Sequence, residues 1–174
     1  MKILQVIPYF VPAWDYGGPL QVCYAFSRQL VARGHEVTVY TTDTLNIKNR
    51  IQKVEDIIDG IKIKRFRNVS NALTYRQHLY FPPGMFLAAQ KDLKSFDIIH
   101  MHEYRNFLNA LIHHYAVKFH LPYILQAHGS LPRKRGKQTF KKIYESLWGN
   151  RLLRDASMVL SLTQTETEQY KEIG

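Results

Sequence analysis

Apolar residues of this chain gather in short runs, and between the runs apolar and polar positions recur every three or four residues. The short runs are typical of buried strands and the longer periodic segments of helices with one buried face. Strands that alternate with helices indicate a parallel sheet with right-handed crossovers. The predicted strands span residues 2–7, 35–42, 60–66, 95–101, 122–126 and 157–161, and the predicted helices span residues 20–32, 82–94, 105–119, 138–154 and 163–172.

Local signals add detail at several boundaries. Gly34 suits the end of the first helix. Thr163, with Glu166 three residues later, forms a capping-box pattern at the start of the last helix. Residues 46–59 are polar and irregular. Residues 60–66 alternate apolar with basic side chains, which predicts an edge strand with one face in water.

The expected fold is therefore a single α/β domain, residues 1–174, with a Rossmann-like, doubly wound parallel sheet of at least six strands. The six predicted strands, numbered along the chain, are expected in the spatial order 3-2-1-4-5-6. Ligands of such sheets bind at the carboxyl ends of the strands, near the point where the strand order reverses. Candidate site residues are accordingly those that directly follow a strand.

Composition narrows the class of protein. Of the 174 residues, 45% are hydrophobic and 22% are charged, which is typical of a globular chain. The one cysteine, Cys23, excludes a disulfide framework and suits a reducing compartment, and we expect it to be a buried core residue. The first apolar run is short and is broken by Pro8 and Pro12, so it does not resemble a signal peptide. We expect a cytoplasmic protein without a membrane-spanning helix.

The formal net charge of +10 would attract nucleic acid, anionic lipid or a phosphorylated substrate. Residues 133–142 hold six cations, among them Arg133, Lys134 and Lys137, with apolar residues beside them. Cations at the start of a helix oppose its macrodipole, which favours an anionic partner over a solvated helix entrance. Basic residues beside apolar ones suit an anionic lipid surface. No nucleic-acid-binding signature accompanies the charge, so we expect no nucleic-acid partner.

A pair of glycines, Gly17 and Gly18, follows the first predicted strand. Glycine tolerates positive φ and lets a ligand approach the backbone closely. The spacing is neither the G-x-G-x-x-G dinucleotide fingerprint nor a Walker A motif. A structural turn and a phosphate or sugar contact are both consistent with this pair.

Histidines follow the fourth and fifth predicted strands. His100 and His102 alternate along a strand and should share a face. Two histidines without a completing cysteine or carboxylate pattern make a poor zinc site, so we expect packing or cleft lining and no metal. His128, which precedes Gly129, can hydrogen-bond a ligand or act as a base, and a structural role is its alternative.

Six segments, in order along almost the whole chain, form a recognisable set: Lys-Ile-Leu-Gln-Val at 2–6, the Gly17-Gly18 loop, Leu-x-x-Arg-Gly-His-Glu-Val at 30–37, Phe-Asp-Ile-Ile-His-Met-His at 96–102, Ala-His-Gly at 127–129 and Leu-Leu-Arg-Asp-Ala at 152–156. This set resembles the N-terminal half of the retaining glycosyltransferases of family 4, which have the GT-B fold. In that family two Rossmann-like domains face each other across a cleft. The first mostly binds the acceptor, and the second holds the nucleotide-sugar and carries a Glu-x7-Glu motif.

The resemblance implies a role for each candidate residue. Gly17 and Gly18 would lie near the donor phosphate and the acceptor. His128 would contact the donor sugar near the reacting centre, and His102 and Tyr104 would line the acceptor side.

The resemblance extends to the basic segment, where Arg133, Lys134 and Lys137 would meet a phosphate-bearing lipid acceptor or an anionic membrane surface. The protein would then be peripheral on the inner face of a membrane. No metal or other cofactor is expected, because helix dipoles and basic side chains can stabilise a leaving diphosphate.

The sequence lacks a Glu-x7-Glu motif, so we expect the C-terminal donor-binding domain to be absent and the chain to be inactive by itself. The expected function is that of the acceptor-binding half of a hexosyltransferase-type enzyme, which moves a sugar from a nucleotide-sugar to a polysaccharide or lipid-linked acceptor. The alternative is a non-catalytic subunit that recruits a catalytic half to the membrane.

Overall fold

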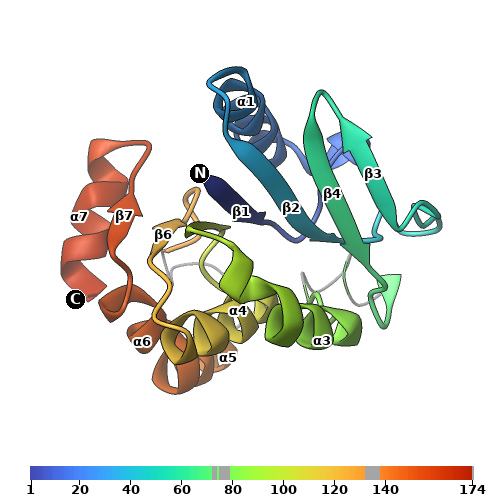
Figure 1. Cartoon of the computed structure of the whole chain (residues 1–174). Coiled ribbons are helices and arrows are strands. Elements are labelled where there is room, and N and C mark those ends of the chain that lie inside the picture. Colours follow the sequence, from blue (N-terminus) through green and yellow to red (C-terminus); the bar gives the residue numbers. More distant parts are fainter. Residues whose placement is uncertain (72–73, 75–78, 132–137, 174) are drawn as a thin grey trace.

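The computed structural model describes residues 1–71, 74, 79–131 and 138–173. Seven strands form one sheet in the order β3-β4-β2-β1-β5-β6-β7 (Figure 1). Every neighbouring pair is parallel except β3 with β4. The strands are β1 (Lys2–Val6), β2 (Glu36–Thr42), β3 (Glu55–Ile58), β4 (Ile61–Phe66), β5 (Ile98–His102), β6 (Tyr123–Gln126) and β7 (Met158–Leu160). The helices are η1 (Trp14–Tyr16), α1 (Gly18–Ala32), α3 (Pro83–Asp92), η2 (Leu93–Ser95), α4 (Phe107–Lys118), α5 (Gln138–Tyr144), η3 (Glu145–Gly149), α6 (Asn150–Arg154) and α7 (Gln164–Ile173).

Helices cover both faces of the sheet. Figure 1 shows α1 on one side of the strands and α3 with α4 on the other. In the central strand β1, Leu4 and Val6 have no exposed surface, as expected for a parallel strand covered on both faces. The predicted Rossmann-like, doubly wound α/β fold is therefore confirmed. The six predicted strands also lie in the predicted order, which reverses between β1 and β5.

The predicted edge strand was wrong. The strand over residues 60–66 lies between β2 and β3 as β4, and the sheet ends at β3, inside the segment predicted to be irregular. Asp59 and Gly60 connect β3 to β4, with φ of 49° and 78°, and Ile58 pairs with Ile61 across them. Two central residues with positive φ suit the right-handed twist of a tight hairpin. The Asp-Gly pair was the sequence signal for this hairpin.

The predicted helix over residues 138–154 is interrupted. Between α5 and α6, η3 is a π-helical turn. Tyr144 is buried, with its hydroxyl 2.9 Å from the carbonyl oxygen of Asn106, whereas Ile143 is 52% exposed. Of these two neighbouring residues, Tyr144 therefore faces the core and Ile143 the solvent. The side chain of Phe140 is outside the described part of the chain.

Two local predictions are confirmed. The Thr163 hydroxyl oxygen accepts a hydrogen bond from the Glu166 amide at 3.1 Å, which caps α7. Cys23 has no exposed surface. In the part of the chain described here, no helix is long and apolar enough to cross a bilayer.

Candidate functional site

The strand ends bring three candidate residues to one edge of the sheet. His102 is the last residue of β5, and His128 comes two residues after β6, its parallel neighbour. Gly17 ends the loop that leaves β1 and directly precedes α1. His102 and His128 are in contact, with His102 Nδ1 2.8 Å from His128 Nε2. This edge is the carboxyl edge, where doubly wound sheets bind ligands.

A buried line of side chains connects β1 to this edge. The Gln5 Oε1 atom lies 2.7 Å from His102 Nε2, and both side chains are fully buried. His100 packs against His102 with ring centroids 4.1 Å apart, so the predicted shared face of these two histidines is confirmed. Sequence reasoning did not single out Gln5. A polar residue inside an otherwise apolar strand run was the signal that could have found it.

Burial keeps the histidines neutral. Burial lowers the pKa of His100 and of His128 to about 4. Burial and the two neighbouring histidines hold the pKa of His102 well below its usual value. Near neutral pH these side chains therefore act as hydrogen-bond donors and acceptors and carry no charge. Among the described residues, no three His, Cys, Asp or Glu side chains are grouped to hold a metal ion.

Glu103, the residue after β5, was missed from the sequence. Its φ is 63°, a backbone conformation that residues other than glycine rarely adopt. The Tyr9 hydroxyl donates a hydrogen bond to its carboxylate, and Tyr9 stacks on Tyr16 with centroids 4.4 Å apart. Burial raises the pKa of Glu103 to about 7. A strained, half-buried acid next to His102 is the kind of feature found at functional sites.

The turn that carries His128 is held from α7. His128 and Gly129 both have positive φ, 53° and 74°. The Gly129 amide donates to Glu166 Oε1 at 2.7 Å, and the Leu162 amide donates to Glu166 Oε2 at 2.7 Å. The predicted capping glutamate thus also fixes the His128 turn, a contact that helix-capping rules do not predict.

The glycine pair divides between two roles. Gly17 has φ 83° and ψ −143°, which strongly favours glycine, so the turn itself requires it. Gly18 begins α1 without positive φ, and no heavy atom lies within 4 Å of the position a Cβ would take. The amide groups of a first helical turn have no partner within the helix. The start of α1 therefore has open space beside Gly18.

Tyr104 stands apart from the exposed edge. The Tyr104 ring is fully buried against Tyr144, at 6.2 Å between centroids, so it lines no surface in this structure. Arg133, Lys134 and Lys137 lie outside the described residues.

Arg105, also missed from the sequence, ties the loop after His128 to the helices. Its guanidinium donates to the carbonyl oxygens of Ser130 and Leu131 and to the carboxylate of Glu145. The Arg105 side chain is 9% exposed and the Glu145 side chain 2%. This buried ion pair joins the site loop to η3.

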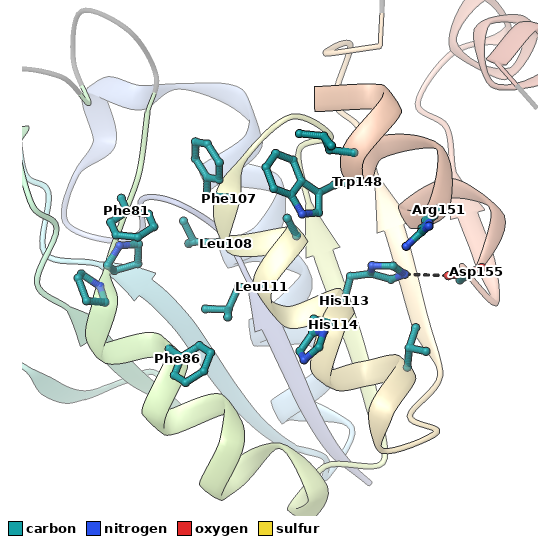
Figure 2. Close-up of a pocket in the computed structure, with 15 residues that line it drawn as sticks. Phe81, Phe86, Phe107, Leu108, Leu111, His113, His114, Trp148, Arg151 and Asp155 are labelled. Carbon is teal, nitrogen blue, oxygen red and sulfur yellow. Dashed lines mark hydrogen bonds and ion pairs between the residues drawn. The ribbon is translucent and has the colours of Figure 1, made fainter. Parts of the chain in front are cut away.

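A concave region lies between α3, α4 and the η3–α6 segment (Figure 2). It is an apolar groove of about 620 Å³. Phe81, Phe86, Phe107 and Trp148 line it, and His113 meets Asp155 at 2.9 Å on one side. None of the histidines at the carboxyl edge borders this groove.

Solved structures share this fold. Sucrose-phosphate synthase from Thermosynechococcus elongatus matches 98% of this chain, with a TM-score of 0.72 and 13% identity, over 44% of its own chain. Anabaena Alr3699/HepE, solved with UDP and glucose, matches 100% of this chain, with a TM-score of 0.63 and 16% identity, over 41% of its own chain. The chain thus spans less than half the length of these proteins, and identities this low show the fold alone. A comparison with curated proteins gave no match.

Family membership rests on a separate finding. Residues 16–174 match Glycosyltransferase Family 4, and this range includes the glycine pair, the histidines of the carboxyl edge and the capping glutamate of α7. The solved structures share the GT-B fold and match this chain over about 40% of their length, which corresponds to an N-terminal half. The chain therefore belongs to glycosyltransferase family 4, as its sequence motifs implied.

Proposed function

We propose that this chain is the acceptor-side half of a glycosyltransferase that moves a sugar from a nucleotide-sugar to a polysaccharide or lipid-linked acceptor. The observation that carries the proposal is the contact between His102 and His128 on the carboxyl edge of a family 4 domain. HepE of the same fold was solved with UDP-glucose, which supports a nucleotide-sugar as donor. In this proposal Gly17 and Gly18 lie near the donor phosphate and His128 near the reacting sugar.

The residues of the edge fit transfer without a metal or cofactor. Neutral His128 can hydrogen-bond a sugar hydroxyl, and the open start of α1 can face a diphosphate. Tyr104 is too deeply buried in this structure to reach the acceptor directly. We assign it to the acceptor side only through the loop and helices that it supports.

The test is transfer by a protein that joins this domain to its donor-binding half, with His128→Ala compared with the parent. Losing one hydrogen bond that acts in the transition state costs about 2–4 kcal/mol, so kcat should fall roughly 10²- to 10³-fold with a smaller change in donor KM. His114→Ala, an exposed histidine away from the edge, is the control. Parent-like kinetics for His128→Ala would give that residue a structural role only.

A membrane-facing acceptor is the finer part of the proposal. Ile143 and Leu147 are each 52% exposed and four residues apart, and Lys142, directly before Ile143, is also exposed. In the sequence, these residues follow the basic segment that holds Arg133, Lys134 and Lys137. Apolar and basic side chains together suit an anionic lipid surface, at about 1 kcal/mol per cation.

Vesicle sedimentation tests this part. Changing Arg133, Lys134, Arg135 and Lys137 to Gln should release the protein from anionic vesicles, and added salt should do the same. The control changes four exposed lysines elsewhere, Lys2, Lys48, Lys91 and Lys171, to Gln, which alters the net charge equally. Equal release by both sets would show net charge to be the cause and would reject the basic segment as an anchor.

A second candidate function uses the same surface. Exposed Ile143 and Leu147 beside Lys142 would equally suit a non-catalytic partner subunit that recruits a catalytic half to the membrane. Co-purification with a separate donor-binding chain would support this alternative. Nucleotide-sugar binding by the present chain alone would count against both versions, since calorimetry should detect only weak binding without a donor-binding half.

A further inference from the structure

A glutamine at the centre of the sheet is linked to the proposed reacting centre by two hydrogen bonds. Gln5 is fully buried in β1, and its Oε1 atom lies 2.7 Å from His102 Nε2. The other nitrogen of that ring, Nδ1, lies 2.8 Å from His128 Nε2. His102 thus bridges Gln5 and His128 with both of its ring nitrogens.

With the oxygen of the Gln5 amide facing His102, the chemistry of these groups fixes where the protons lie. An amide oxygen can only accept a hydrogen bond, so His102 Nε2 must carry a proton and donate to Gln5. Neutral His102 then has an unprotonated Nδ1, which must accept from His128 Nε2–H. Neutral His128 is left with an unprotonated Nδ1.

Neighbouring groups do not set this pattern. His100 stacks on His102 and is neutral, so it adds no charge. Glu166 accepts hydrogen bonds from the amides of Gly129 and Leu162, one on each oxygen. In the described part of the chain, Nδ1 of His128 has no hydrogen-bond partner. That atom is therefore free to accept from a ligand.

We propose that Gln5 is a positioning residue which, through His102, makes Nδ1 of His128 a hydrogen-bond acceptor, so that the site takes a ligand hydroxyl that donates to it. The identification of that hydroxyl with a sugar rests on the proposed function. The placement of the protons does not.

Removing the side-chain amide of Gln5 should reverse the direction of the hydrogen bond between His102 and His128. In Gln5→Met, His102 Nε2–H would be a buried donor without an acceptor, which is unfavourable. Moving the His102 proton to Nδ1 lets it donate to His128 Nε2 instead. His128 then carries its proton on Nδ1 and offers a donor to the ligand. Methionine has a similar length to glutamine, so the strand can keep its packing.

The test is NMR of the ¹⁵N-labelled 174-residue chain, because protonated and unprotonated ring nitrogens have well-separated ¹⁵N shifts. Spectra of His102→Gln and His128→Gln identify the signals. In the parent protein, both residues should show a protonated Nε2 and an unprotonated Nδ1. In Gln5→Met, most of the His128 signal should move to protonated Nδ1. Gln126→Met, at a buried glutamine whose side chain interacts with His100 and not with His102 or His128, should leave the pattern unchanged.

Two results would overturn the proposal. Protonated Nδ1 on both rings of the parent protein would mean that the hydrogen bonds between Gln5, His102 and His128 run in the opposite direction. An unchanged pattern in Gln5→Met would remove Gln5 as its cause, provided that the variant still unfolds cooperatively. The parent spectrum decides the first point even if the variant does not fold. Neither readout requires sugar transfer, so failure of the proposed function would leave this test intact.

Discussion

The carboxyl edge and the aromatic groove contrast in what they bury and what they expose. The edge buries polar groups: Gln5, His100 and His102 are each at most 3% exposed. The groove exposes apolar groups: Phe81 is 57% exposed and Phe86 48%. The edge also holds residues with positive φ, Glu103 and His128, whereas no groove residue in the described chain has a positive φ.

The contrast shows that the carboxyl edge, and not the groove, contains features that lower the stability of the fold unless their surroundings compensate. Buried polar groups and positive φ are each unfavourable unless the surroundings compensate, so a protein without a use for them would lose them. Exposed aromatic side chains are far less costly to the folded state. The stability of the edge should therefore depend on single partners and on pH, whereas the groove should tolerate substitution.

The largest effect is expected at the ion pair that supports the edge. Arg105→Met removes a buried ion pair with Glu145 and three further hydrogen bonds to the loop and carboxylate, and should lower the free energy of unfolding by about 3–5 kcal/mol. Urea unfolding measures the change. Arg154→Met breaks a pair whose arginine is 72% exposed, and should cost less than about 1 kcal/mol. Similar losses in both variants would show that burial of the pair does not matter.

Stability should fall as the pH is lowered from about 6.5 to 5. In that range His100 and His128 bind protons in the unfolded protein but stay unprotonated in the folded protein, where their pKa values are about 4. Glu103 has the opposite sign: its folded pKa of about 7 keeps it protonated, which stabilises the fold at low pH and is lost as the pH rises. Together with His102, three histidines act against the single Glu103. The unfolded protein therefore binds one to two more protons than the folded protein, which should lower the free energy of unfolding by about 2–4 kcal/mol over this range.

Variants separate the two contributions. Glu103→Gln should steepen the loss of stability with falling pH by about 1.4 kcal/mol per pH unit, because the opposing proton is removed. Exposed His114→Gln should leave the profile unchanged. Urea unfolding at pH 5, 5.75 and 6.5 gives the slopes. A flat profile in the parent would mean that the edge histidines titrate normally.

A smaller effect is expected at Gly149, the residue after Trp148 of the groove. A Cβ on Gly149 of η3 would lie 2.5 Å from the Tyr104 hydroxyl and 3.1 Å from its ring carbon. Gly149→Ala should therefore destabilise the protein by about 1–3 kcal/mol, measured as thermal or urea unfolding. Gly84→Ala, whose Cβ would meet Phe66 at an ordinary 3.7 Å, should not. Equal stability of the two variants would mean that Tyr104 moves aside freely.

The smallest effect is expected in the groove. Phe86 packs edge-on to Tyr115 at 5.5 Å, and Phe86→Ser should cost about 1 kcal/mol without changing the pH profile. The same unfolding series measures both quantities. A loss above about 3 kcal/mol would show that the groove is part of the core, and the contrast with the edge would fail.

Local patterns predicted much of the fold. The strand order and the Thr163 cap followed from periodicity and capping rules, because these signals act between residues close in sequence. The same rules failed where tertiary packing determines which side of a helix is buried and which is exposed. Tyr144 and Ile143 are adjacent, yet one is buried and the other exposed. The hairpin at Asp59-Gly60 was missed because its strand, β3, is short and acidic.

By itself, the sequence determined that His102 and His128 follow parallel strands and so reach the same edge. Only the tertiary structure decided the hydrogen-bond partners and the protonation states of those residues. The hydrogen bond of His102 to Gln5 joins residues 97 positions apart, and the neutral state of the histidines comes from burial beneath loops and helices. Residue type and spacing fix which edge a side chain reaches. Its partners, its protonation and its pKa depend on which distant segments exclude water from it.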